Sequence, residues 1–500
     1  MKKPGIITID IGTTSTRAVL FDSAGIQVFL SRRDSQPTYH PDGRVEQPAE
    51  SWAALLPSLL SDCAASARSN DLEPVCIALT SLRSSVIPVD REGKALHPAI
   101  MWQDLRTEAL CRDMAAHNAE VYGICGMKIT PVMSAVKMRW FREQTPDLFR
   151  RTWKMVGIHD SVLRTLTGRF VTDPSLASRT NLLNLGTLDW DEDLIALFGL
   201  SRSLLCDMIP PGSVAGGLVP SMAADTGLPA GLPVVSAGGD QQCAALGLGL
   251  TSPDRIVANT GTGSYLLAYS ARPVFDSEMR VFCNAAAVPG AYVVEAGLPA
   301  SGVIYRWFGE HIYEGAKDQG CAQVDYDLVN AEAAASPPGA GGLIFLPHFK
   351  GSGAPHFNPL AKGTFHNLDL NTTRGDLGRA ILEGIAAEMA DNLELLETLT
   401  QGVDWVNSSG GLSKFGLFNR IQADMYERKV RRAEHGEATA LGAWISAAKA
   451  IGLYGSLAEA FAAAAAGSPT EEYLPDSASV EFYGRLRAAR RALYDSLYPA

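Results

Sequence analysis

The chain has 500 residues, 46% of them hydrophobic and 19% charged, and a formal net charge of −11 at pH 7. These values are ordinary for a globular protein, and the length exceeds what one hydrophobic core usually holds, so we expect two large domains. The acidic balance argues against a nucleic-acid partner, because binding to a phosphate backbone needs a basic surface. We interpret the local basic cluster Arg428-Lys429-Val430-Arg431-Arg432 as a solvated turn and strand edge.

The cysteines and the apolar runs indicate a cytoplasmic protein. The eight cysteines are scattered without any Cys-x-x-Cys spacing, so we expect reduced core residues rather than zinc ligands or disulfides. No apolar run approaches the roughly 20 residues of a membrane span. The short apolar run after Lys3 ends at Asp10, which is typical of a first strand and not of a secretory signal. We therefore expect no membrane partner.

A glycine- and hydroxyl-rich turn joins two β-type runs between residues 6 and 22. The turn and its flanks read Asp10-Ile-Gly12-Thr13-Thr14-Ser15-Thr16-Arg17. Such a turn exposes backbone N–H groups, and its hydroxyls can donate to phosphate oxygens. Asp10 can hold a magnesium ion that shields the phosphate charge. An ordinary polar hairpin has the same local features, so that alternative stays open.

A second turn of the same kind lies in the other half of the chain. It reads Asn259-Thr260-Gly261-Thr262-Gly263-Ser264-Tyr265 and is again flanked by two β-type runs. Two half-length units with such turns indicate a duplicated architecture whose halves face each other across a nucleotide. The chain contains no G-x-x-x-x-G-K-[ST] motif. Gly263 leads into an apolar strand rather than into the third glycine and helix of a dinucleotide fold.

Strands and helices alternate between these turns, as in a layered α/β protein. A helix is expected after Pro48, with its apolar face at Leu55, Leu56, Leu59, Leu60 and Cys63, and strands are expected at 75–79 and 86–89. The polar turn after the first of these strands contains Arg83, a substrate-binding candidate because ligand groups collect at strand ends. A solvated surface arginine is the alternative.

Three further segments carry candidate ligand-binding residues. Trp102, before a helix through Leu110, could stack on the C–H face of a sugar or be a core tryptophan. Asp240 follows a glycine pair that would let a substrate alcohol approach a basic carboxylate, but it could also be a plain N-cap. Gly410 and Gly411, before a helix through Met425, permit close contact with a flat ring such as adenine, or form a simple turn.

Together these segments resemble the FGGY family of carbohydrate kinases, over residues 6 to about 451. The resemblance rests on Asp10-Ile-Gly-Thr-Thr-Ser-Thr-Arg17, Trp102-Gln-Asp-Leu-Arg-Thr107, Thr172-Asp173-x-Ser175-x-Ala177-Ser178, Gly238-Gly-Asp-Gln-Gln242, Asn259-Thr-Gly-Thr-Gly263, Arg379-Ala-Ile-Leu-Glu383-Gly384, Gly410-Gly411 and Glu437-Ala-Thr-Ala-Leu-Gly442. It implies a two-domain actin-like ATPase (ribonuclease H-like) α/β fold, with domains at residues 1–250 and 251–500. It also implies phosphoryl transfer from ATP to a small sugar or polyol.

The resemblance further implies roles for the candidate residues. Asp240 aligns with the family's catalytic base and, with Asp10, would hold Mg²⁺. The residues implied for ATP and its phosphates are Gly12, Thr13, Thr14, Ser15, Arg17, Gly261, Thr262, Gly263, Gly410 and Gly411. Those implied for the substrate are Arg83, Ser84, Trp102, Gln103, Asp240, Gln241 and Tyr265. We expect a hinge near residues 250–256, and a homodimer is compatible with the resemblance because dimers are common in the family.

The chain departs from the better-known family members at the expected substrate pocket. Glycerol kinases have Arg-Glu where this chain has Arg83-Ser84 and a tyrosine where it has Val132, while xylulokinases have Met-His-Gly at the Arg83 turn. Smaller side chains leave a wider pocket, which favours a polyol, ketose or sugar acid of about four to six carbons. Xylulokinase or glycerol kinase proper is one alternative, and a catalytically silent sugar or nucleotide sensor is another. Residues 454–500 are expected to form terminal helices whose arginines face solvent.

Overall fold

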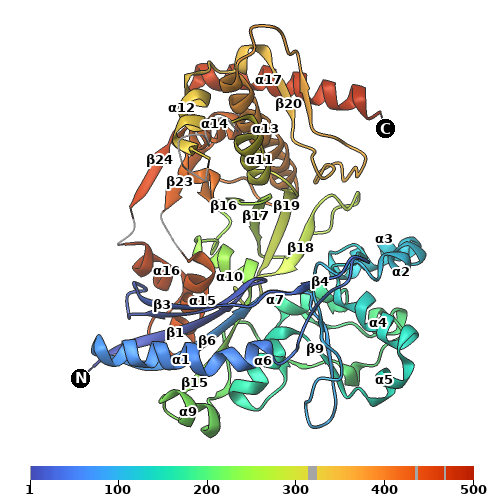
Figure 1. Cartoon of the computed structure of the whole chain (residues 1–500), viewed down its shortest axis with the longest axis vertical. Helices are drawn as coiled ribbons and strands as arrows, with labels where there is room; N and C mark the ends of the chain where they lie inside the picture. The colour runs from blue at the N-terminus through green and yellow to red at the C-terminus, as the bar shows by residue number, and fades with distance from the viewer. Residues whose placement is uncertain (1, 314–323, 434–436, 467–468, 500) are drawn as a thin grey trace.

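The computed structural model describes residues 2–313, 324–433, 437–466 and 469–499 (Figure 1). Two large mixed sheets organise this part of the chain. The first runs in the spatial order β14 (Ser213–Gly217), β15 (Pro233–Gly239), β6 (Leu72–Ser81), β1 (Lys3–Ile11), β2 (Ser15–Phe21) and β3 (Gln27–Asp34). The second runs β18 (Phe282–Ala285), β19 (Tyr292–Leu298), β17 (Ser264–Ser270), β16 (Arg255–Thr260), β22 (Trp405–Ser409), β23 (Lys429–Ala433) and β24 (Thr470–Tyr473).

The two sheets share one arrangement around the predicted turns. In the first sheet, β1 pairs antiparallel with β2 across the turn at residues 12–14 and parallel with β6. In the second, β16 pairs antiparallel with β17 across the turn at residues 261–263 and parallel with β22. This repetition agrees with the predicted actin-like fold of two related halves. The upper body in Figure 1 comes mainly from the second half of the chain and the lower body from the first.

Helices cover both faces of the first sheet, which explains why its strands read as nearly continuous apolar runs. One face packs on α1 (Ser51–Ser69), α6 (Ile158–Thr167) and α9 (Pro220–Thr226). The other packs on α10 (Asp240–Gly247), α15 (Ala438–Ala450) and α16 (Leu457–Ala465). Successive side chains of β1 alternate between the faces: Ile7 and Ile9 contact the first group of helices, and Ile6 contacts the second.

The helices α15 and α16 cross from the second half of the chain to the first sheet. They lie beside β1 and β3 in Figure 1, although the sequence places them in the expected domain 251–500. Their alanine-rich sequences permit this close packing: Gly442 of α15 lies so near α10 that a Cβ atom there would be 1.8 Å from the Cys243 carbonyl oxygen. Spatially, residues 438–465 therefore belong with the first sheet.

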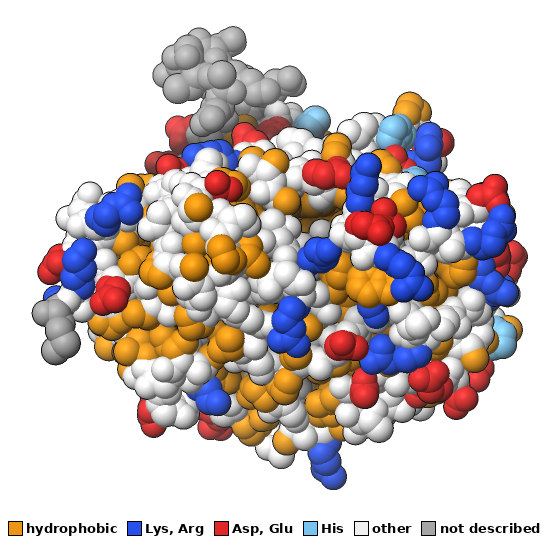
Figure 2. All heavy atoms as spheres, turned by 90° about the horizontal axis from the view of Figure 1, so that it is seen from below, with side chains coloured by type: hydrophobic (Ala, Val, Ile, Leu, Met, Phe, Trp, Pro, Cys, Tyr) orange, Lys and Arg blue, Asp and Glu red, His pale blue; other side chains and the backbone are white. Residues whose placement is uncertain are grey.

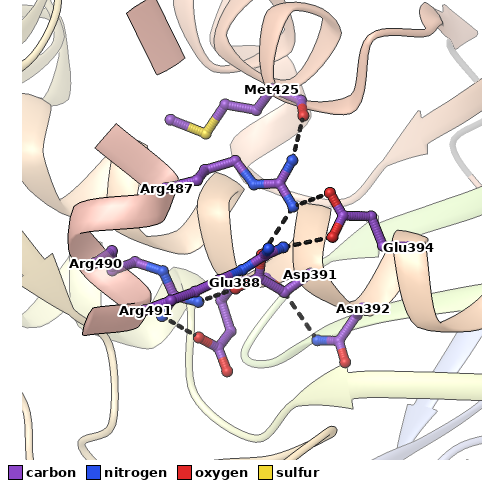
Figure 3. A network of polar contacts seen from close by, with 8 residues as sticks. All are labelled: Glu388, Asp391, Asn392, Glu394, Met425, Arg487, Arg490 and Arg491. Atoms are coloured by element: carbon purple, nitrogen blue, oxygen red, sulfur yellow. Dashed lines mark hydrogen bonds and ion pairs between the residues drawn. The ribbon is translucent and has the colours of Figure 1, made fainter. Parts of the chain in front are cut away.

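The second sheet carries its own set of helices. They are α11 (Gly302–Ile312), α12 (Tyr326–Ala335), α13 (Arg374–Leu399), α14 (Gly416–Tyr426) and α17 (Ser477–Leu497). The expectation that the arginines of the terminal helix face solvent is wrong for two of them. Arg487 and Arg490 are only 8% and 3% exposed, because they form ion pairs with carboxylates of α13 (Figure 3).

Shorter elements complete the first half of the chain and link the second. The helices are α2 (Glu108–Asp113), α3 (Asn118–Cys125), α4 (Ser134–Gln144), α5 (Pro146–Arg151), α7 (Pro174–Ala177) and α8 (Glu192–Leu197). The short strands are β4 (Thr38–Tyr39), β5 (Val45–Gln47), β7 (Ile87–Val89), β8 (Ala99–Ile100), β9 (Lys154–Val156), β10 (Val171–Thr172), β11 (Leu183–Asn184), β12 (Asp189–Trp190), β13 (Asp207–Met208), β20 (Ile344–Leu346) and β21 (Thr364–His366). The predicted helix after Pro48 is α1, and the strands predicted at 75–79 and 86–89 coincide with β6 and β7.

Surface and cysteine features of the described residues agree with the composition. The seven described cysteines are buried and free, whereas Cys321 lies outside the described residues. No helix among the described ranges is long and apolar enough to cross a membrane. On the face seen in Figure 2, basic and acidic side chains are interspersed. The cluster at 428–432 lies on or beside β23, which is not an edge strand as expected, because it pairs with β22 on one side and β24 on the other. Arg431 of β23 pairs with Glu472 of β24 at 2.6 Å.

Candidate active site

The first turn is tight and places a buried carboxylate at the end of β1. The Gly12 N–H donates to the Ser15 carbonyl at 2.9 Å. Asp10, the cross-strand partner of Arg17, is only 7% exposed. Burial and, next, the Asp240 carboxylate raise the pKa of Asp10 to about 7, while Arg17 opposes the shift. The first turn and Asp240 therefore belong to one electrostatic site.

Arg17, which was expected to contact phosphate, forms an ion pair in this structure. Its Nη1 lies 2.5 Å from Oε2 of Glu437, the residue before α15. Both side chains stay partly exposed, at 32% and 22%. The ion pair therefore ties the first hairpin to the crossing helix at the edge of the site.

Asp240 is not an N-cap in the structure. Gly239 occupies the N-cap position of α10, and no side-chain cap bond forms there. Asp240 Oδ1 accepts from the Gln241 N–H at 2.7 Å and lies 3.2 Å from Arg83 Nε. Burial raises the pKa of Asp240, and the Arg83 guanidinium opposes that shift. The carboxylate is thus held by one arginine and remains partly exposed.

The glycine pair before Asp240 packs closely against two side chains of the protein. A Cβ atom at Gly238 would lie 2.7 Å from Ser175 Oγ, and one at Gly239 would lie 2.6 Å from Arg83 Cδ. The positions that Cβ atoms would take at these glycines are therefore already occupied by Ser175 and Arg83, so the packing of the protein itself requires glycine here. Gly238 also has φ +118°, a conformation that favours glycine.

The Arg83 turn rests on a buried lysine. Ser84 has φ +67° and is 8% exposed. Lys137 Nζ donates to the Ser84 carbonyl at 2.9 Å and to the Val132 carbonyl at 2.7 Å. Burial lowers the pKa of Lys137 to about 7. The two positions where the sequence departs from glycerol kinases are therefore joined through one side chain.

Arg179 is a site residue that the sequence reasoning missed. Burial and then the Arg83 charge lower the pKa of Arg179 to about 10, with Glu295 and Asp240 opposing. Tyr265 of β17 belongs to the same group, because burial and then Glu295 raise its pKa while Arg179 and Arg83 lower it. The signal was available, since Arg179 directly follows the Ala177-Ser178 segment of the family resemblance. Arg83 and Arg179 of the first half thus interact electrostatically with Glu295 and Tyr265 of the second.

Trp102 contacts the first turn, whereas the neighbouring Gln103 contacts β4. Trp102 Nε1 donates to Thr13 Oγ1 at 3.1 Å, and the side chain is 40% exposed. Gln103 Nε2 donates to the Tyr39 hydroxyl at 3.2 Å. Trp102 is therefore not a core tryptophan.

The second turn is built against two neighbouring segments. The Gly261 N–H donates to the Gly263 carbonyl at 2.9 Å, and the Gly302 N–H donates to the Gly261 carbonyl at 3.0 Å. A Cβ atom at Gly263 would lie 2.7 Å from the Leu298 carbonyl oxygen. At Gly410, where φ is +92°, a Cβ atom would lie 2.4 Å from the Thr260 carbonyl oxygen. The glycines at 263 and 410 therefore permit close backbone contact.

A groove of about 490 Å³ opens beside the second turn. Its lining includes Gly261, Thr262, Tyr305, Gly411, Lys414 and Phe415. The groove thus joins the second turn to the glycine pair that precedes α14. Apolar rings and small residues line it together with a lysine, a combination suited to a base and its phosphates.

The comparisons with known proteins agree with this arrangement. Family profiles described as the N-terminal and C-terminal domains of the FGGY family of carbohydrate kinases match residues 5–247 and 256–451. A glycerol kinase from Alkalilimnicola ehrlichii is 32% identical over 480 residues, covering 93% of this chain and 94% of that protein. A gluconokinase from Bacillus licheniformis is 30% identical over 460 residues, covering 90% and 87%.

A solved structure of a carbohydrate kinase is also similar to this chain along nearly its whole length. The crystal structure of a xylulose kinase from Rhodospirillum rubrum superimposes with a TM-score of 0.90 and 28% identity, covering 99% of each chain. The fold and site therefore define a two-domain carbohydrate kinase, an enzyme that uses ATP as phosphoryl donor. The chain belongs to the FGGY family.

Proposed function

We propose that the chain transfers the γ-phosphoryl group of ATP to a hydroxyl of a small sugar or polyol, with Asp240 as general base. The observation that carries this proposal is the position of Asp240. Its carboxylate lies 3.2 Å from Arg83 Nε and acts electrostatically on Asp10 at the first turn. A base beside both a candidate sugar-binding arginine and a phosphate-binding turn is what phosphoryl transfer to an alcohol requires.

The two turns and the groove support ATP binding. Thr13, Thr14 and Ser15 offer hydroxyl and N–H donors at the first turn, and Thr262 does so at the second. The base and ribose would occupy the groove beside Gly411. Closure of the two halves about residues 250–256 would exclude water from the γ-phosphate.

Asp10 and Asp240 are suited to a magnesium ion. Among the described residues no group of three or more His, Cys, Asp or Glu side chains could hold a metal ion by itself. Mg²⁺ in kinases is commonly held by one or two carboxylates together with substrate phosphates and water. The electrostatic coupling of Asp10 to Asp240 fits that pattern. When bound, the ion would neutralise charge on the phosphates.

Asp240 would take the hydroxyl proton late in the reaction, as the new P–O bond forms. An alcohol is hardly acidic before that point, and base assistance of this kind contributes about 10²–10⁴ in rate. The raised pKa of Asp240 makes it a better proton acceptor than an exposed aspartate. Arg83 would then keep the carboxylate oriented.

The substrate pocket around Asp240 would be formed by Arg83, Ser84, Trp102, Gln103, Gln241 and Tyr265, with Arg179 added. The small side chains at Ser84 and Val132 favour a substrate of about four to six carbons, a polyol, ketose or sugar acid. Xylulose and glycerol remain alternative substrates, since relatives bear both names.

A coupled ADP-release assay tests this function. Mg-ATP is incubated with glycerol, tetritols, pentitols, ketopentoses, ketohexoses and aldonic acids, and ATP hydrolysis without sugar is the control. We expect sugar-dependent ADP release with one class of compound. ATP binding without turnover on any compound would instead favour the sensor function.

A further inference from the structure

The strand that leads to Asp240 contains an irregularity just before the catalytic position. The parallel register of β15 and β6 shifts between Ser236 and Gly238, so Ala237 is an extra residue in β15. A bulge bends a strand and changes the direction of the side chains that follow it. The direction of Asp240 therefore depends on how this bulge is held.

Buried polar groups of α7 hold the bulge from one side. Ser175 Oγ accepts the Gly239 N–H at 3.0 Å. Ser175 donates its hydroxyl proton to Asp173 Oδ1 at 2.5 Å, and its N–H reaches the same oxygen at 2.9 Å. Both Ser175 and Asp173 are 0% exposed. With its proton committed to Asp173, the serine oxygen is available as an acceptor for the Gly239 N–H.

The other oxygen of Asp173 is fixed in the same way. Ser236 Oγ donates to Asp173 Oδ2 at 2.7 Å, and His159 Nε2 lies 2.9 Å from Ser236 Oγ. Because Ser236 gives its proton to the carboxylate, His159 is the donor in that contact. Asp173 has no ion-pair partner within 4.0 Å in the described part of the chain. Asp173 therefore holds Ser236, which precedes the bulge, and Ser175, which binds Gly239 after the bulge.

We propose that Asp173 and Ser175 are positioning residues that fix the bulge of β15 and thereby aim Asp240 at the substrate hydroxyl. This inference rests on the proposed role of Asp240. It also explains why residue 238 is a glycine, because a Cβ atom there would lie 2.7 Å from Ser175 Oγ. It predicts that loss of the Ser175 hydroxyl disturbs the chemical step more than substrate binding.

Steady-state kinetics of Ser175→Ala test the inference, with Ser178→Ala as matched control. Ser178 is also 0% exposed and lies directly after α7, but its hydroxyl donates to the Pro174 carbonyl at 2.7 Å and accepts the Ala285 N–H at 2.8 Å. We expect kcat of Ser175→Ala to fall by about 10²-fold, the scale of a small misplacement of a catalytic group. The KM values for sugar and ATP should stay near wild type, and Ser178→Ala should keep its kcat.

A double variant separates positioning from general damage. In an Asp240→Asn background nothing remains to be aimed, so adding Ser175→Ala should cause no further loss of kcat. If Ser175→Ala does not fold, Asp173→Asn replaces it, because asparagine keeps the side-chain shape. Asp173→Asn should also lower kcat. The inference would be overturned by wild-type kcat in both Ser175→Ala and Asp173→Asn. Equal losses of kcat in Ser175→Ala and Ser178→Ala, or additive losses in the double variant, would also overturn it. Wild-type kcat in Asp240→Asn would instead overturn the proposed function on which it rests.

Discussion

Arg17 of the first hairpin and Glu437 at the start of α15 form an ion pair with a 2.5 Å contact, although the two residues lie in opposite halves of the sequence. Glu437 also contributes to raising the pKa of Asp10. A carboxylate therefore stands where Arg17 was expected to meet a phosphate. Bound triphosphate and Glu437 would compete for the same guanidinium.

This competition predicts opposite effects for two substitutions. Arg17→Gln should raise the KM for ATP, because a phosphate-binding charge is lost. Glu437→Gln should lower it, because Arg17 is released and a negative charge near the phosphates is removed. Initial rates against ATP concentration at saturating sugar measure both. Equal and parallel changes in KM would show that the pair is only structural.

Gly410 and Gly411 should respond differently to alanine. Gly410 has φ +92°, and a Cβ atom there would lie 2.4 Å from the Thr260 carbonyl oxygen, whereas a Cβ atom at Gly411 would meet nothing within 4 Å. Gly410→Ala should lower the free energy of unfolding by more than about 2 kcal/mol through backbone strain and displacement of β16. Gly411→Ala should change it by less than about 0.5 kcal/mol. Urea denaturation of both variants checks this, and similar losses would contradict it.

The ion pairs between α13 and α17 should contribute strongly to stability. Arg490 is 3% exposed and lies 2.5 Å from Glu388, and it also pairs with Asp391 (Figure 3). Asp391 keeps its contacts with Arg487 and Arg491 when Arg490 is removed, but the buried Glu388 carboxylate loses its arginine. Arg490→Met should therefore cost about 3–5 kcal/mol. Arg485→Ala, which removes an exposed pair with Glu481, is the control and should cost at most about 0.5 kcal/mol. Equal losses in chemical denaturation would refute the distinction.

His159 should make the protein less stable in mild acid. It is 1% exposed, and burial lowers its pKa from 6.5 to about 3. Below pH 6.5 the unfolded chain therefore binds a proton that the folded chain does not. The free energy of unfolding should fall on this account by up to about 1.4 kcal/mol for each pH unit between 6.5 and 3.

The contribution of His159 can be isolated by substitution. Buried carboxyls such as Asp160, whose pKa burial raises to about 6, act in the opposite direction as the pH falls. The comparison of wild type with His159→Gln removes these shared contributions. Denaturation between pH 6.5 and 4.5 should show a shallower fall for the variant, and identical slopes would exclude His159 as the source.

Local patterns in the sequence predicted a layered α/β arrangement with two strand–turn–strand units, whereas the actin-like fold was implied by the family resemblance. The two strand–turn–strand motifs became β1–β2 and β16–β17, because glycine turns between β-rich runs have few other conformations. The Arg83 turn and the glycine pair before Asp240 could be located for the same reason. Their grouping around one site came from the family resemblance, and the contact of Arg83 with Asp240 came from the structure.

The remaining features depend on contacts between distant segments. The position of Arg179 directly after Ala177-Ser178 was visible in the sequence, but its electrostatic interactions with Arg83 and Glu295 became known only from the structure. Ser175 reaches Gly239 only because α7 packs beside β15, and no periodicity in the sequence records that contact. Likewise, the alanine-rich helices α15 and α16 carry no mark of the sheet on which they pack. Burial of Arg487 and Arg490 escaped prediction because arginine is usually exposed.

The central claim is that Asp240 is the base of a sugar kinase, and one comparison tests it most directly. Wild type and Asp240→Asn are assayed for sugar phosphorylation by ³¹P NMR, with calorimetry of ATP binding on the same samples. The account predicts that Asp240→Asn binds ATP but forms sugar phosphate about 10²–10⁴ times more slowly. Sugar phosphate formed by Asp240→Asn at the wild-type rate would contradict it.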